Sequence, residues 1–117
     1  MGDRGTLQAG YTGGIFKDFR AGTKDIDPGD EQYIDSVIPP AGTILLQWIM
    51  GVIQGSAKQQ TCTLLLLNNS TLDYSGMESG DNINYDITFE RVGAYIKLKV
   101  KNNEADLISF RFKRLSV

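Results

Sequence analysis

The sequence predicts an all-β protein, a single antiparallel β-sandwich of the jelly-roll or immunoglobulin-like type, preceded by an extended N-terminal arm. Short apolar stretches separated by turn residues fill the chain from Ile34 to Val117. In the last third, apolar and polar residues alternate with a period of two, as expected for strands with one buried and one wet face. No stretch has sustained helical periodicity. Six or seven strands without helices are expected to pack as two layers.

Length and composition fit one domain. The chain has 117 residues, of which 41% are hydrophobic and 22% charged, which is ordinary for a folded globular protein. Its one cysteine, Cys62, excludes an internal disulfide and favours a reducing compartment or a stabilising assembly. We expect no membrane contact, because the longest apolar stretch, residues 43–53, is too short to cross a bilayer.

Residues 1–31 differ from the rest and are predicted to form the arm, with the sandwich spanning residues 32–117. Seven of the 13 glycines lie in the first 31 residues, where apolar side chains show no sustained period. The arm is nevertheless too apolar for an inert linker, so we expect it to dock on a neighbour or on its own sheet through Leu7, Tyr11, Ile15, Phe16 and Phe19. An irregular first strand around Ile15 to Phe19 is the alternative.

The first strands are expected at residues 32–38, 43–53 and 61–67. Strand 32–38 places Ile34, Ser36 and Ile38 on one face and ends at Pro39-Pro40, because proline cannot donate to a ladder. Residues 43–53 are apolar on both faces, which predicts a central strand with one face in the core and the other covered.

The later strands follow closer to the C-terminus. A short edge strand is expected at residues 72–74, followed by a glycine-rich loop at 77–82. Clear alternation then predicts strands at 83–90, 94–101 and 107–115. The last two are expected to form a hairpin around a turn at residues 102–105.

The residues that usually carry catalysis are missing. Histidine is absent, which removes the commonest general base and metal ligand. Cys62 lies in an apolar strand without a base to activate it and is interpreted as a core residue. Asp25 to Glu31 is rich in carboxylates, but its spacing does not match a calcium loop. We therefore expect no enzyme activity, catalytic residue, cofactor or metal site.

Charge is distributed unevenly. Up to Glu90 there are 12 acidic and 5 basic residues, whereas from Arg91 onward 7 basic residues face 2 acidic ones. If residues 102–105 make a hairpin, one wet surface gathers five basic side chains that we expect to bind an acidic partner: Lys97, Lys99, Lys101, Arg111 and Lys113. There are two alternatives: the charges pair within one subunit, or the lysines lie on an edge strand and discourage aggregation. Nucleic acid is not expected, because interleaved stacking aromatics are mostly missing.

Three segments carry a family resemblance: residues 37–43 (VIPPAGT), 63–68 (TLLLLN) and 78–83 (ESGDNI). Residues 35–115 resemble small β-sandwich virion proteins of tailed bacteriophages, found as capsid decoration proteins, head fibres and baseplate or tail-fibre modules. The resemblance implies a non-enzymatic virion protein, made in the host cytoplasm, that forms a homo-oligomer, in many relatives a trimer. It also implies other virion proteins, such as the major capsid protein, as partners.

Capsid decoration, with docking through the arm and the charged faces, is therefore the expected function. The alternative is a tail or fibre-tip module that recognises a host glycan through exposed aromatic residues, namely Tyr33, Tyr74, Tyr85 and Tyr95. Trp48 is expected in the core, since it sits in the most apolar strand. A small enzyme subunit or regulator is a third class that no residue pattern supports.

Overall fold

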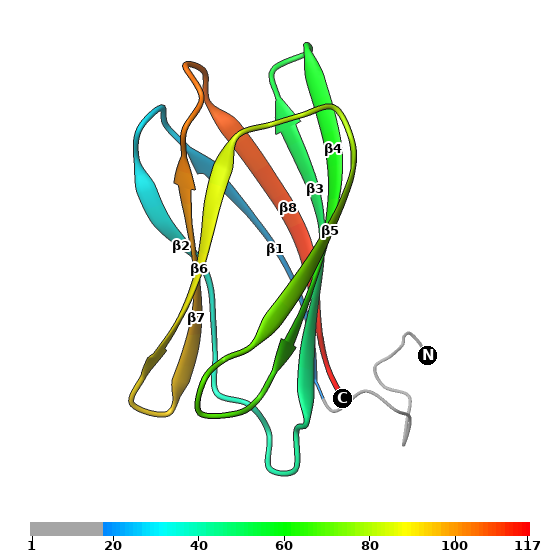
Figure 1. Cartoon of the computed structure of the whole chain (residues 1–117), viewed down its shortest axis with the longest axis vertical. Helices are drawn as coiled ribbons and strands as arrows, with labels where there is room; N and C mark the ends of the chain where they lie inside the picture. Colours follow the sequence, from blue (N-terminus) through cyan, green and yellow to red (C-terminus); the bar gives the residue numbers. More distant parts are fainter. Residues whose placement is uncertain (1–17) are drawn as a thin grey trace.

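The structure is a computed structural model that describes residues 18–117, with side chains from residue 20 onward. It contains eight strands in that part of the chain: β1 (Asp18–Ile26), β2 (Glu31–Val37), β3 (Leu45–Gln54), β4 (Lys58–Leu67), β5 (Tyr74–Gly80), β6 (Tyr85–Val92), β7 (Tyr95–Asn102) and β8 (Ile108–Ser116). All pairings are antiparallel. A large sheet of order β1-β8-β3-β4-β5 faces a small sheet of order β2-β7-β6 (Figure 1). The predicted all-β sandwich is confirmed.

The core lies between the two sheets and follows from alternation along the strands. In β3 the inward positions carry Leu46, Trp48, Met50 and Val52, all of them buried. The inward residues of β7 and β8 meet them and are equally buried: Ile96, Leu98, Val100, Ile108, Phe110 and Phe112. Burial of each such side chain contributes about 1.5–3 kcal/mol, which makes this interior the main source of stability.

β1 corrects the predicted boundary between arm and sandwich. Residues 18–26 pair with β8 in unbroken register from Asp18↔Ser116 to Ile26↔Ile108, and Ile26 is fully buried. Gly22, which suggested a flexible arm, lies against Phe112, where an added Cβ would come within 2.5 Å of the ring. This glycine is therefore needed for packing. Phe19 lies in β1, whereas Leu7, Tyr11, Ile15 and Phe16 of the predicted arm lie outside the described residues.

A β-bulge in β2 overturns the predicted face of that strand. The register with β7 shifts between Tyr33 and Asp35, so that Ile34 and Asp35 are both buried while Ile38 is exposed. The bulge turns the Asp35 carboxylate into the interior, where Oδ2 accepts hydrogen bonds from Trp48 Nε1 at 2.9 Å and Arg114 Nη1 at 2.8 Å. One carboxylate thus ties the small sheet to two strands of the large sheet.

β5 replaces the predicted loop at residues 77–82. The strand pairs regularly with β4 from Gln60↔Gly80 to Leu66↔Tyr74. All of its seven residues are exposed, and it forms one edge of the large sheet. Its serines and glycines have low strand propensity, so the apolar β4 beside it decides its conformation.

The predicted hairpin of the last two strands is also wrong. β7 belongs to the small sheet and β8 to the large sheet, so residues 103–107 cross from one layer to the other (Figure 1). Asn102 fixes the crossing, because its buried Nδ2 donates to the carbonyl oxygens of Ile26 and Asp106, both at 2.9 Å. Its Oδ1 accepts from the backbone N–H of Glu104 at 2.7 Å. The asparagine that suggested a tight turn instead joins the two layers.

Candidate interaction surfaces

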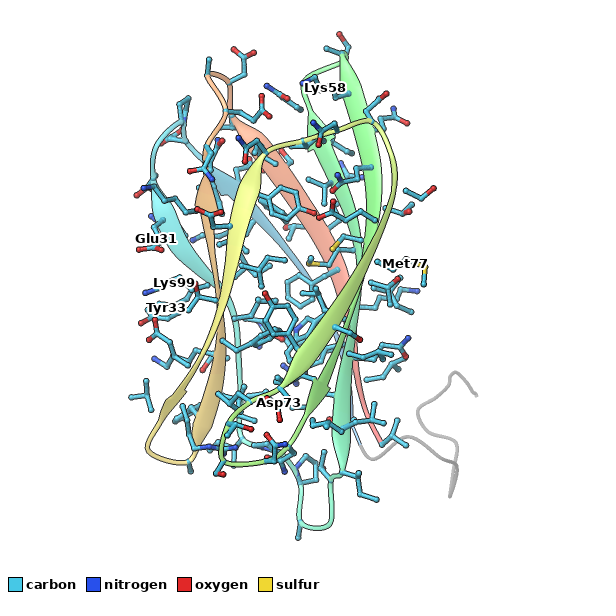
Figure 2. The ribbon with its side chains drawn as sticks, in the orientation of Figure 1. Glu31, Tyr33, Lys58, Asp73, Met77 and Lys99 are labelled. Atoms are coloured by element: carbon cyan, nitrogen blue, oxygen red, sulfur yellow. The ribbon has the colours of Figure 1, made fainter. Side chains whose placement is uncertain are left out.

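The outer face of the small sheet carries the three lysines of β7 among acidic neighbours. In register, Lys97 stands beside Glu90, and Lys101 stands between Glu31 and Asp86. Lys99 Nζ contacts Glu90 Oε2 and lies 3.8 Å from Glu31 Oε1. Figure 2 shows Glu31, Tyr33 and Lys99 gathered on this side of the molecule. The lysines therefore have acidic partners within the subunit.

Tyr33 joins these charges, and we call Glu31, Tyr33, Glu90, Lys97 and Lys99 the closed charge network. Its hydroxyl donates to Glu90 Oε1 at 2.9 Å, and its ring has Lys97 Nζ at 5.0 Å and Lys99 Nζ at 5.6 Å from the centroid. The hydrogen bonds from Lys99 and then Tyr33 lower the pKa of Glu90, while the bond to Glu90 raises the pKa of Lys99. Each charge in this group holds its neighbour in the ionised form.

The two basic residues of β8 lie on the opposite outer surface. Arg111 pairs in register with Gly51 and Lys113 with Ile49, on the outer face of the large sheet. The five predicted basic residues do not form one surface, because β7 and β8 lie in different layers. The structure brings Lys97, Lys99 and Lys101 together and separates them from Arg111 and Lys113. Whether either group binds a partner stays a prediction.

The outer face of the large sheet contains exposed apolar side chains on three neighbouring strands. Ile49 of β3 is 47% exposed, Leu65 and Leu67 of β4 are 44% and 46% exposed, and Met77 of β5 is 76% exposed. The register places Ile49 beside Thr63, Thr63 beside Met77, and Leu67 beside the half-buried Leu45. We call Leu45, Ile49, Leu65, Leu67 and Met77 the open face. Figure 2 shows Met77 on the side opposite Lys99.

The second face of β3, which the sequence predicts to be covered, is not covered by residues 18–117. No described element lies over it, as the large sheet is the outermost layer on this side (Figure 1). The sequence signal was present, since apolar residues fill both faces of residues 43–53. That signal indicated a cover without indicating what supplies it, and residues 18–117 leave the face exposed. Contiguous exposed apolar patches mark protein interaction sites on soluble proteins.

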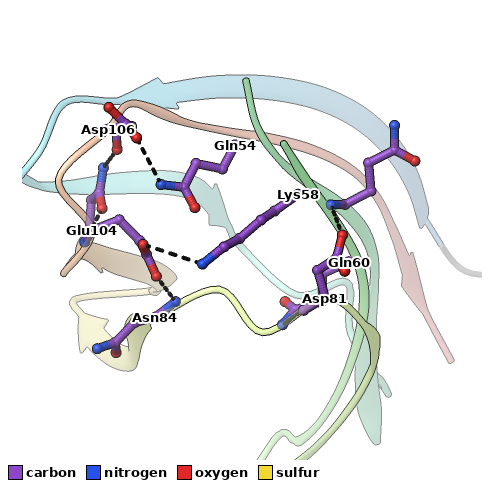
Figure 3. A network of polar contacts seen from close by, with 9 residues as sticks. Gln54, Lys58, Gln60, Asp81, Asn84, Glu104 and Asp106 are labelled. Atoms are coloured by element: carbon purple, nitrogen blue, oxygen red, sulfur yellow. Dashed lines mark hydrogen bonds and ion pairs between the residues drawn. The ribbon is translucent and has the colours of Figure 1, made fainter. Parts of the chain in front are cut away.

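One end of the sandwich is closed by polar contacts that join two loops to the start of β4 (Figure 3). Glu104, after β7, accepts from the backbone N–H of Asn84 at 2.6 Å and lies 3.9 Å from Lys58 Nζ. Asp81 accepts from the backbone N–H of Gln59 at 2.8 Å. The bond from Asn84 lowers the pKa of Glu104. These contacts join loops of both sheets and are structural, since each carboxylate already has donors from the protein.

A groove of about 920 Å³ opens between the inner side of β5 and the free edge of β6. It exists because the large sheet extends past the small one, which leaves the inner residues of β5 exposed. Two tyrosines and Glu78 line it above an apolar floor, with these residues in chain order: Cys62, Leu64, Tyr74, Gly76, Glu78, Tyr85, Asp86, Ile87 and Thr88. Rings beside carboxylates are suited to stacking on and hydrogen-bonding a polyhydroxylated ligand.

The titratable groups in the floor of the groove are not reactive. Burial raises the pKa of the Cys62 thiol and of the Tyr85 hydroxyl, which keeps both protonated near neutral pH. The Tyr85 hydroxyl donates to Gln60 Oε1. The groove therefore offers recognition chemistry, with the Glu78 carboxylate as a hydrogen-bond acceptor on its β5 side.

A further sequence candidate is the carboxylate-rich segment Asp25 to Glu31, in which Asp30 makes hydrogen bonds to its own neighbours. Asp30 is held in a turn, where its carboxylate accepts from the N–H of Glu31 at 2.8 Å and from Gln32 Nε2 at 2.7 Å. Residues 18–117 contain no group of three or more acidic or cysteine side chains arranged to hold a metal ion. The same residues form no helix of the length and apolarity that a membrane crossing requires.

Comparison with known proteins leaves the family of this chain open. No family model matches it, and neither does any curated protein. Among solved structures, it is similar to tailspike protein gp49 of Acinetobacter baumannii bacteriophage Fri1, a capsular polysaccharide depolymerase. That similarity has a TM-score of 0.40 and 10% sequence identity, and covers 84% of this chain. The chain spans 17% of the length of the tailspike.

Proposed function

We propose that this chain is a non-enzymatic structural protein of a tailed-phage virion, which attaches to another virion protein through the open face. The observation that carries the proposal is the contrast between an apolar outer surface on the large sheet and a charge-paired one on the small sheet. The resemblance of residues 35–115 to small β-sandwich virion proteins supports the assignment to a virion.

The open face has the chemistry of a protein interface. Its residues are large and aliphatic, and they sit on strands whose backbone is already paired, so docking requires little ordering. Arg111 and Lys113 lie beside it on β8. A partner with an apolar surface bordered by acidic residues fits this combination.

Capsid decoration is the finer form of this proposal, with the major capsid protein as the partner. The chain would bind as a homo-oligomer at repeated sites, and residues 1–17, with Leu7, Tyr11, Ile15 and Phe16, would add contacts. A sandwich without disulfides suits such a role, because attachment to the assembly stabilises the folded state by mass action.

The test is rebinding of the purified chain to phage particles from which it has been removed. Threonine at both Ile49 and Leu65 should weaken binding about 100-fold or more, as each change removes an apolar anchor. The matched control places glutamine at Lys97 and Lys101 on the small sheet and should bind like the wild type. Equal binding by wild type and the open-face variant would remove the docking proposal, and absence of the chain from purified particles would remove the virion assignment.

A second candidate function is recognition of a glycan by a tail or fibre-tip module, which the groove between β5 and β6 favours. Tyr74 and Tyr85 would stack on sugar rings, and Glu78 would accept hydrogen bonds from hydroxyl groups. A carboxylate in the groove favours neutral over acidic sugars.

A glycan array probed with the isolated chain separates this function from capsid decoration. Glutamine at Glu78 with alanine at Tyr74 should abolish any specific glycan signal, whereas asparagine at Asp25, an exposed acid on β1, should leave it unchanged. No signal from the wild-type chain, or a signal that survives the groove variant, would exclude the groove as a glycan site.

A further inference from the structure

The described chain has four sheet edges, and three of them carry features that discourage pairing with another strand. β1 carries four charged residues, namely Asp18, Arg20, Lys24 and Asp25. β2 is interrupted by its bulge, and β6 carries Asp86, Glu90 and Arg91. Charges and bulges on edge strands are the devices by which proteins prevent edge-to-edge association.

β5 is the unprotected edge. It contains one charged residue, Glu78, has no proline, and shows no shift in its register with β4. All seven residues are exposed, and Met77 at its centre is the most exposed of the large apolar side chains in the described part of the chain. An exposed and nearly uncharged edge without a bulge is a template for another strand.

The sequence of β5 is complementary to itself in the antiparallel direction. Pairing of the whole strand with a second copy puts Met77 opposite Met77 on the two-fold axis. Tyr74 then lies opposite Gly80, Ser75 opposite Ser79, and Gly76 opposite Glu78. Every large inward side chain faces a glycine, and an aromatic residue over a glycine across an edge is a favourable pair. A shift of two residues toward the C-terminus would instead place Glu78 opposite Glu78.

We propose that two copies of this chain associate through antiparallel pairing of their β5 strands about a two-fold axis at Met77. The two large sheets then become one continuous sheet of ten strands, since each contributes five. The open faces of the two copies lie on the same side of that sheet. The inference concerns the isolated chain and does not depend on a virion partner.

The test is the dimer affinity of the full-length chain, measured by sedimentation with two matched double variants. Lysine at both Ser75 and Ser79 puts like charges opposite each other twice in the dimer and should weaken it on the order of tenfold or more. Lysine at Ser75 with glutamate at Ser79 puts opposite charges in the same places and should retain or strengthen the dimer. Both variants change the same exposed positions and should melt alike.

Crosslinking tests the register. A cysteine at Met77 should be joined to its symmetry mate by a short bis-maleimide, whereas single cysteines at Ser75 or Ser79 should join only when the two proteins are mixed. The native Cys62 is buried and should not react.

Four outcomes would overturn the proposal. The first two are a wild-type chain that stays monomeric at millimolar concentration and equal dimer affinities for the two double variants. The third is a dimer that is lost on deletion of residues 1–17 but is unaffected by lysine at Ser75 and Ser79, which would assign the pairing to the N-terminal segment. The fourth is a dimer that is lost with threonine at Ile49 and Leu65 but is unaffected by lysine at Ser75 and Ser79, which would assign the pairing to the open face.

Discussion

The two outer faces of the sandwich are built from the same alternating pattern but differ in what stands beside each outward residue. On the small sheet, Lys99 of β7 contacts both Glu31 and Glu90, Lys97 stands opposite Glu90, and the Tyr33 ring lies beside the amines of these two lysines. On the large sheet, Ile49 stands between Thr63 and Lys113, and Leu65 stands between Gln47 and Ser75. The charges of the small sheet are paired within the subunit, whereas the large sheet leaves apolar surface exposed to water.

The difference shows that cross-strand neighbours decide whether a surface can serve as an interface. Exposed ion pairs already formed within a subunit give little to a partner, because their exchange gains about 0–1 kcal/mol. Exposed aliphatic groups gain about 25 cal/mol for each Å² removed from water. The large sheet is therefore the face from which association draws free energy, and the following changes test how the two sheets are built and joined.

The largest effect is expected from truncation, which tests whether β1 is an essential strand of the large sheet. Deletion of residues 1–30 removes β1 and should abolish cooperative unfolding, because Ile26 leaves the core and β8 loses a neighbour. Deletion of residues 1–17 should keep a cooperative transition. Circular dichroism during urea denaturation measures both. A cooperative transition in the longer deletion would show that β1 is dispensable.

Replacement of Asp35 tests the connection between the sheets. Alanine there leaves the buried guanidinium of Arg114 without its carboxylate and should cost about 3–5 kcal/mol of unfolding free energy. Alanine at Asp86, an exposed acid of β6, should change stability by about 0.5 kcal/mol or less. Urea titration at neutral pH provides the comparison, and a similar cost for both variants would contradict the bridging role of Asp35.

Gly51 tests whether the open face is free of cover. It lies on the outer side of β3 with no atom within 4 Å of an added Cβ and no positive φ. Alanine there should raise the unfolding free energy by about 0.4–1 kcal/mol, because the unfolded chain loses freedom that the strand does not need. Alanine at Gly22 is the opposite control and should destabilise through contact with Phe112. A destabilised Gly51→Ala variant would indicate a cover over this face.

The smallest effect concerns the pH dependence of the closed charge network. The pKa of Glu90 lies below its ordinary value of 4.5, so its contribution to stability is present above that pH and is lost as pH falls through the lowered pKa. Glu90→Gln should therefore lower the urea midpoint slightly at neutral pH, and this difference should shrink as the pH falls through the lowered pKa. A difference that does not change with pH would point to packing instead of charge, and Asp25→Asn serves as the control.

Much of the fold was predictable because alternation and turn residues report local structure directly. The strands at residues 83–90 and 94–101 and the burial of Trp48 follow from pattern alone. The placement of β7 and β8 in different layers does not, since a turn sequence and a crossing between sheets both use asparagine and acidic residues. The bulge at Asp35 depends on a guanidinium 79 positions away, which no local pattern reveals.

The candidate surfaces were harder to predict for the same reason. Lysines at alternate positions indicated a basic surface, but the acids that pair with them come from β2 and β6. Residues of β4, β5 and β6 line the groove, and the sequence predicts mostly a loop where β5 lies. Apolar residues on both faces of β3 were visible in the sequence, and only the sheet order shows that one face is outermost.

The most direct test of the difference between the two faces is oxidative footprinting of the chain, free and bound to phage particles. The account predicts that Ile49 and Leu65 lose most of their oxidation on binding, while Tyr33 and Tyr95, which are about equally exposed in the free chain, keep theirs. Protection of the two tyrosines with continued oxidation of Ile49 and Leu65 would show that the small sheet docks and would contradict the account.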